Sequence, residues 1–341
     1  MSFLNRKSVA GSAGRSPALS VKRELDFFIA TIFNFGLITI LLVGSLFISR
    51  TGTTERAVCS VETTPIQQQD DDVVRVNSDL VVLNATVLDK HGQFVSGLKR
   101  SDFKVFEDGQ EQRLSSFSTE GTPFAAAIVI DTSGSMDTRM TLARGAAITF
   151  LEGLRAEDVA AVYSFDNKVE RWQDFSPGRD LPPRVFGLHG KGMTVLNDAV
   201  LRAADDVAQR TEKRRAIVVL SDGGENFSRA SSDKALEHAL KANATVYAVN
   251  MSEEGPGRDI QGTMILKNFA AKSGGTYISS PGGQALRDAF ADILEELSHQ
   301  YTLAYRPTNR ERDGKWRAVD VKISRADVSV RTRKGYRAAK G

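Results

Sequence analysis

The sequence predicts a doubly wound α/β fold with a mostly parallel sheet as the main domain, placed over residues 122–300. Two observations predict it: continuous apolar segments alternate there with amphipathic ones, and each apolar segment has the length of a strand. Apolar segments without polar alternation are typical of strands buried on both faces, and strands that alternate with helices pair in parallel. A third observation, period-two alternation on both sides of this domain, predicts a small antiparallel β module built from the N- and C-terminal flanks.

The composition is that of a globular protein. The chain has 341 residues, of which 41% are hydrophobic and 26% charged, so extensive disorder is not expected. Cys59 is the only cysteine, which excludes a disulfide framework within the chain and a zinc site built from several cysteines. The four histidines show no metal-ligand spacing such as H-E-x-x-H.

An uncharged apolar segment at residues 27–49 predicts one N-terminal transmembrane helix. At about 1.5 Å of rise per residue this segment can cross a hydrocarbon core of about 30 Å. It is also longer than the roughly 7–15 residues of a signal-peptide core. A cleaved signal with a long N-terminal region, or a buried core helix, is the alternative.

The charges beside this segment predict its orientation. Residues 1–26 carry five basic and two acidic residues, whereas residues 50–72 carry two basic and five acidic residues. By the positive-inside rule, residues 1–26 form a cytoplasmic basic tail. We therefore expect a single-pass protein of the cytoplasmic membrane with an extracytoplasmic C-terminal domain. Residues 50–72, rich in Thr, Gln and Asp, are expected to form a flexible stalk.

The two flanks of the main domain are predicted to consist of strands. Residues 73–121 show β-branched alternation, with turn residues at 90–92 and 107–109. Residues 301–341 alternate in the same way and carry twelve basic against four acidic residues. Such a basic run could attract an anionic surface, although the solvated face of exposed strands is its commoner explanation.

Within residues 122–300 the apolar pattern predicts four strands and four helices. The segment that contains Trp172 and Phe175 is expected to form a hairpin at the sheet edge, with both aromatic side chains in packing roles. The predicted strands are residues 124–131, 159–165, 216–222 and 244–250, and the predicted helices are residues 139–154, 195–209, 233–242 and 283–298.

Polar side chains follow these strands at the positions where a ligand site is expected. Asp131, Ser133 and Ser135 come at and directly after the end of the first buried strand. Thr194 follows a glycine-containing loop and begins a helix, and Asp222 ends another strand. Because ligands of open α/β sheets bind at the carboxyl ends of the strands, these five side chains are candidates for one site.

All five candidate side chains offer hard oxygen ligands, which favour Mg²⁺, or else Mn²⁺ or Ca²⁺, over zinc or copper. Three neutral hydroxyls leave a bound cation more electrophilic than a cage of carboxylates would, so it could attract a carboxylate from a partner. Asp137 is a possible outer ligand, and a helix-start role is the alternative for it. Helix capping is also the alternative for Asp131 and Ser133, but capping does not explain Thr194 and Asp222.

The pattern DTSGSM, GMT and SDG in residues 122–300 resembles the metal-ion-dependent adhesion site of von Willebrand factor A domains and integrin I domains. The flanking segments SDFKVFEDG and YTLAYRPTNRERDGKWRAVDVKIS look like the VWFA-related domain family common in acidobacteria. The resemblance implies that Ser133, Ser135 and Thr194 bind the metal directly. It further implies that Asp131 and Asp222 bind the metal through water or switch between direct and water-mediated coordination. A Glu or Asp of a protein ligand then supplies the last oxygen that coordinates the metal.

These observations favour a membrane-anchored extracytoplasmic binding or adhesion module that holds a protein partner through a divalent metal. The first alternative is a metal-stabilised structural scaffold of an envelope complex. The second is a metal-dependent hydrolase, but phosphatases with an aspartyl nucleophile usually carry a second Asp two residues on, where this chain has Ser133. We therefore expect no enzyme activity and no nucleic-acid partner.

Overall fold

The computed structural model describes residues 80–178, 192–252, 259–280 and 282–341. The predicted tail, transmembrane helix and stalk, over residues 1–72, lie outside the described residues, as do residues 73–79 of the N-terminal β flank. Among the residues that are described, no helix has both the length and the apolar character needed to cross a membrane.

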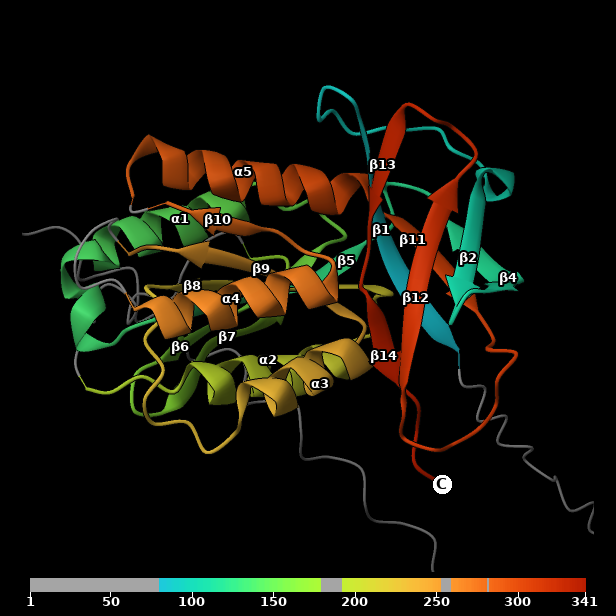
Figure 1. The fold of residues 1–341 in the computed structure, drawn as a ribbon. Helices are drawn as coiled ribbons and strands as arrows, with labels where there is room; N and C mark the ends of the chain where they lie inside the picture. The colour runs from blue at the N-terminus through green and yellow to red at the C-terminus, as the bar shows by residue number, and fades with distance from the viewer. Residues whose placement is uncertain (1–79, 179–191, 253–258, 281) are drawn as a thin grey trace, which may run out of the picture. The chain divides into compact units, whose positions relative to one another are not determined.

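A six-stranded sheet forms the centre of the main domain, with the strand order β10-β9-β8-β5-β6-β7 (Figure 1). All neighbours pair in parallel except β6 and β7, which form an antiparallel hairpin at one edge. The predicted mostly parallel sheet is therefore confirmed. The strands are β5 (Phe124–Asp131), β6 (Val159–Phe165), β7 (Val169–Ser176), β8 (Arg214–Ser221), β9 (Ala244–Asn250) and β10 (Tyr277–Ser279).

Helices cover both faces of this sheet, because alternate side chains of the buried strands point to opposite sides. Ile128 of β5 packs with the helices of one face and Val129 with those of the other. Trp172 of β7 is buried in the first of these cores, in the packing role expected for it. The helices are α1 (Met140–Glu152) and α5 (Gln284–His299) on one face, and α2 (Leu196–Ala208), α3 (Ser232–Lys241) and α4 (Ile260–Ser273) on the other (Figure 1).

Strands from before and after the main domain pair with each other in two further sheets. Their orders are β13-β1-β11-β4 and β14-β12-β2-β3, and side chains from both sheets share one apolar core. Asp108 and Gly109, in a predicted turn, both have positive φ, as a tight hairpin requires. The strands are β1 (Val81–Asp89), β2 (Phe103–Glu107), β3 (Gln110–Gln112), β4 (Leu114–Ser118), β11 (Tyr301–Tyr305), β12 (Trp316–Ile323), β13 (Val328–Arg331) and β14 (Gly335–Arg337); the short helices η1 (Arg100–Asp102) and η2 (Gly134–Arg139) complete the described elements.

Glu296, in the last turn of α5, joins the main domain to the β module. Its Oε1 accepts hydrogen bonds from Thr86 Oγ1 of β1 and from Tyr247 OH of β9, both at 2.9 Å. Its Oε2 forms an ion pair with Arg331 of β13. Because a buried carboxylate needs such partners, this side chain fixes three elements at one point.

We predict that Glu296→Ala lowers the free energy of unfolding by about 2–3 kcal/mol. This is less than the roughly 3–5 kcal/mol of a fully buried pair, because the Arg331 side chain is 32% exposed. The neighbouring Glu295 is exposed, so Glu295→Ala should change the free energy by less than about 0.5 kcal/mol. Urea denaturation of the full chain measures both; similar values for the two variants would contradict the assigned role of Glu296.

Candidate metal centre

Asp131 ends the central strand β5 and is fully buried. Its Oδ1 accepts a hydrogen bond from Ser133 N at 2.9 Å, and its Oδ2 accepts one from Ser221 Oγ at 2.6 Å. Burial is the main cause that raises the pKa of Asp131 to about 7, and the Asp222 carboxylate acts in the same direction. The hydrogen bonds from the two serines oppose this rise.

The two candidate serines lie together after β5. Ser133 Oγ and Ser135 Oγ share a hydrogen bond at 3.1 Å, with Ser133 buried and Ser135 exposed to solvent. Ser133 is the N-cap residue of η2, but its side chain makes no capping hydrogen bond. Capping therefore does not explain why a hydroxyl stands at this position. Asp137 lies in the first turn of η2 with an exposed side chain, as a helix-start residue does.

Thr194 and Asp222 come together from two different loops. A β-carbon placed on Gly224 would lie 3.3 Å from Thr194 Oγ1 and 3.4 Å from Asp222 Oδ1, so both oxygens border the same small space. The loops are tied by Asn226, whose side-chain oxygen accepts a hydrogen bond from Thr194 N at 3.0 Å. In return, Asn226 N donates to Thr194 O at 3.2 Å.

Glu225 fixes the loop after β8 to the start of α2. Its Oε2 accepts a hydrogen bond from Asn197 N at 2.7 Å, and its Oε1 accepts one from Ser228 N at 3.0 Å. The sequence did not single out Ser221, Glu225 or Asn226. These residues lie at or shortly after the end of β8, as Asp222 does, and this position was the only sign of them in the sequence. Only the folded structure shows which atoms they contact.

Hydrogen bonds thus link Asp131 to Ser133, Ser133 to Ser135, and the Thr194 loop to the Asp222 loop, while the two carboxylates are near enough to interact electrostatically. The donor set fits a hard divalent cation, because every candidate ligand atom is an oxygen. A cation would also offset the burial of Asp131 and its repulsion by Asp222. In the described ranges, no group of three or more His, Cys, Asp or Glu side chains offers a competing centre.

The N-terminus of α4 supports the loop that carries Asp222. Gly223 has a φ of 94°, and its backbone touches Gly262 in the first turn of α4. A β-carbon on Gly262 would lie 1.6 Å from the carbonyl oxygen of Gly223, so only glycine permits this approach. The position of the candidate ligand loop therefore depends on a helix that the sequence pattern did not predict.

Residues 126–225 match the family model described as von Willebrand factor type A domain. This range begins inside β5 and ends after Asp222, so it contains all five candidate ligands. No curated protein matches the sequence.

The fold is also similar to solved structures. For the PilB minor pilin from Streptococcus sanguinis, the identity is 17%, the TM-score 0.42, and the match covers 53% of this chain and 62% of that chain. For the vWF domain of the type V pili tip protein Mfa5 from Porphyromonas gingivalis, the identity is 14% and the TM-score 0.41, and the match covers 52% of this chain and 95% of that chain. For von Willebrand factor type A from Catenulispora acidiphila, the identity is 13% and the TM-score 0.42, and the match covers 78% of this chain and 75% of that chain.

We predict that Gly262→Ala destabilises the protein by about 1–3 kcal/mol, the usual cost of overpacking, because the added methyl group must displace Gly223. Gly145→Ala in α1 is the matched control: a β-carbon there meets no atom within 4 Å, and alanine in a helix should stabilise by about 0.5–1 kcal/mol. Thermal melts compare the two variants. A Gly262→Ala protein as stable as wild type would show that the two backbones can separate freely.

Proposed function

We propose that this protein binds one divalent cation through Asp131, Ser133, Ser135, Thr194 and Asp222 and uses it to hold a carboxylate of a protein partner. Mg²⁺ is the first choice, with Mn²⁺ or Ca²⁺ as alternatives. The observation that carries this proposal is the convergence of oxygen side chains from three separate segments at the carboxyl edge of the sheet. Such a site would correspond to the metal-ion-dependent adhesion site that the sequence motif resembles, in a chain with flanks that resemble the VWFA-related family.

The ligand set explains why the cation would favour an acidic partner. When bound, the metal supplies a positive charge with a coordination position for an incoming oxygen. Ser133, Ser135 and Thr194 are uncharged, so they would leave much of this positive charge for the partner. Ser135 is exposed whereas Asp131 is buried, so the accessible side of the site is the side of Ser135.

Two exposed apolar side chains lie beside Thr194 and support a protein partner. Phe227 is 58% exposed, and its backbone N donates to Thr194 O at 3.1 Å; Met193 precedes Thr194 and is 49% exposed. Clustered exposed apolar side chains are typical of protein interaction surfaces.

The proposed location follows from residues 27–49, which would anchor the protein in the cytoplasmic membrane and place the binding domain outside. Binding is preferred over hydrolysis because Ser133 occupies the position of the second aspartate of aspartyl phosphatases. In this proposal the metal holds the partner and no covalent step takes place.

We predict that Thr194→Ala weakens Mg²⁺ binding by more than about tenfold, since even residues that only support a ligand commonly contribute that much. Thr211→Ala, at an exposed threonine outside the site, should leave binding unchanged. Isothermal titration calorimetry of the full chain in detergent measures both. No uptake of Mg²⁺, Mn²⁺ or Ca²⁺ by the wild-type protein would refute the proposal.

We further predict that Phe227→Ser weakens partner binding without changing Mg²⁺ affinity, because it removes apolar contact area beside the metal but no ligand atom. The measurement is a pull-down from envelope extract, in which the relevant partner is one that EDTA and Thr194→Ala both release. Phe106→Ser, at a partly exposed phenylalanine of β2 outside the site, is the matched control and should retain that partner. If both variants retained the partner equally, the exposed apolar side chains would not be part of the interface.

A further inference from the structure

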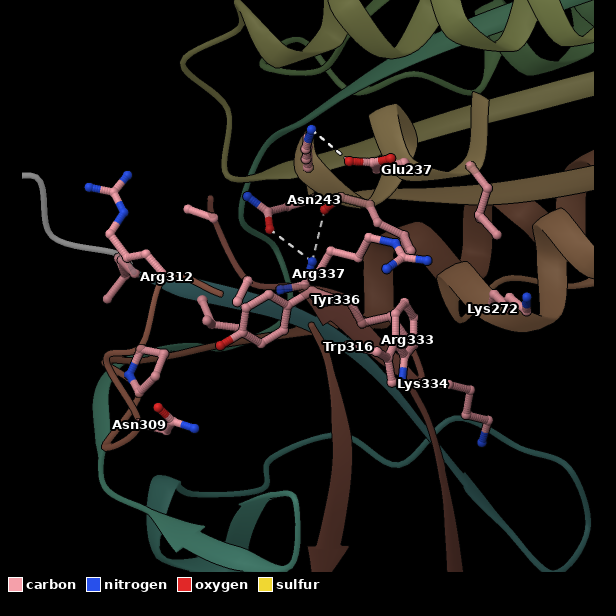
Figure 2. Close-up of a pocket in the computed structure, with 18 of the residues that line it drawn as sticks. Glu237, Asn243, Lys272, Asn309, Arg312, Trp316, Arg333, Lys334, Tyr336 and Arg337 are labelled. Carbon is pink, nitrogen blue, oxygen red and sulfur yellow. Dashed lines mark hydrogen bonds and ion pairs between the residues drawn. The ribbon is translucent and has the colours of Figure 1, made fainter. Parts of the chain in front are cut away.

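A second surface, separate from the candidate metal centre, lies between the main domain and the β module. It is a groove of about 1210 Å³, which we term the basic groove (Figure 2). One wall is α3, and the other walls are the segment 306–312 and the chain around β14. Pockets for small molecules usually measure about 300–1,000 Å³, so this groove has room for a larger ligand.

The lining of the basic groove is strongly cationic, with nine Lys and Arg residues against three Asp and Glu residues. The cations come from segments far apart in the sequence. Lys234 and Lys272 belong to α3 and α4, whereas Lys334 and Arg337 belong to the C-terminal segment. The remaining exposed cations are Lys241, Arg306, Arg310 and Arg312.

Most of these cations make no direct ion pair among the described residues. Seven of these eight exposed cations form no side-chain hydrogen bond or salt bridge with another residue in the part of the chain that the structure describes. By contrast, Lys241 is paired with Glu237 at 2.8 Å across one turn of α3. Like charges that converge in a concave site repel each other and create a positive potential, which a bound anion would relieve.

Arg333 is the framework of the groove rather than one of its exposed cations. Its guanidinium is buried, and Nη1 donates to Leu240 O at 2.9 Å and to Asn243 Oδ1 at 3.2 Å. The same group lies over the ring of Tyr336, 5.6 Å from its centroid. These contacts hold α3 and the C-terminal segment together, so the charged side chains on both walls keep a fixed separation.

The other lining residues distinguish between classes of anion. Asp233, Glu237 and Glu311 would repel a ligand with dense, uniform negative charge, such as polyphosphate or a nucleic-acid backbone. Trp316 and Leu80 in the same lining are 39% and 41% exposed and provide apolar contact area. A lining with both cations and apolar side chains suits a peptide in which acidic and apolar residues alternate.

We propose that the basic groove binds an extended acidic peptide segment of a partner protein, with carboxylates on its exposed Lys and Arg side chains and apolar residues against Trp316. This contact needs no metal and is independent of the carboxylate bound at the candidate centre. The protein would thus have two sites for acidic partners, one that depends on a cation and one that does not.

Tryptophan fluorescence tests this proposal directly, because the chain has two tryptophans and Trp172 is buried. The full chain with Trp172→Phe keeps Trp316 as its only tryptophan. In EDTA, we expect a short peptide of alternating Glu and Leu to change the Trp316 emission in a saturable manner. The double substitution Lys334→Glu with Arg337→Glu should lower the affinity on the order of tenfold, which corresponds to about 1.4 kcal/mol.

The matched control reverses two exposed lysines outside the groove, Lys90→Glu with Lys213→Glu, and should retain the affinity of the parent. Added salt should weaken binding through screening. An equal loss in the control variant, or no response of Trp316, would overturn the proposal. Tighter binding of polyphosphate or of anionic lipid vesicles than of the peptide would overturn the assignment of a peptide ligand.

Discussion

The candidate site depends above all on the buried carboxylate of Asp131 and its two hydrogen bonds. Asp131 ends the strand that lies between β6 and β8, so its position is set by parallel neighbours on both sides. Ser221, at the end of β8, donates to one carboxylate oxygen, and the backbone of Ser133 donates to the other. An unpaired buried charge is costly, and these hydrogen bonds only partly offset burial, since the pKa stays raised. A cation beside Asp131 would therefore offset the remaining cost of burying this carboxylate.

The loops that carry Thr194 and Asp222 are fixed to each other and to α2 by hydrogen bonds. Asn226 joins the Thr194 loop to the loop after β8, and Glu225 joins that loop to the start of α2. The close contact between Gly223 and Gly262 then supports the same loop from α4. Because backbone groups take part in most of these contacts, the candidate ligand positions are set without a metal, which would lower the conformational cost of binding one.

The sequence predicted those elements whose patterns are local. The helix expected at 195–209 occurs at Leu196–Ala208, because its apolar residues recur with the helical period. The strands expected at 159–165 and 244–250 have those bounds, because each is a continuous apolar segment. Helix α4 was missed because Gly262 weakens the helical pattern, and the reason for that glycine is a contact with a loop about forty residues earlier.

The five oxygen side chains could be selected from their strand-end positions, but Asn226 and Glu225 act through contacts across loops. The metal itself stays a prediction. In the sequence, only the positive charge of residues 301–341 indicated the basic groove, because the walls of the groove meet only in the folded chain.

The β module also constrains how the main domain could change shape. Helix α5 continues directly into β11, and Glu296 in its last turn contacts β1, β9 and β13. A movement of α5 along its axis would have to break these contacts of Glu296 or carry β1, β9 and β13 with it. Breaking them would leave a carboxylate and a tyrosine hydroxyl without partners, which costs more than a shift of two packed surfaces. Any motion of α5 that keeps the contacts of Glu296 would therefore carry both the β module and β9 of the central sheet with it. The β13–β14 segment includes Arg333, which also contacts α3, so such a motion would reach the basic groove as well.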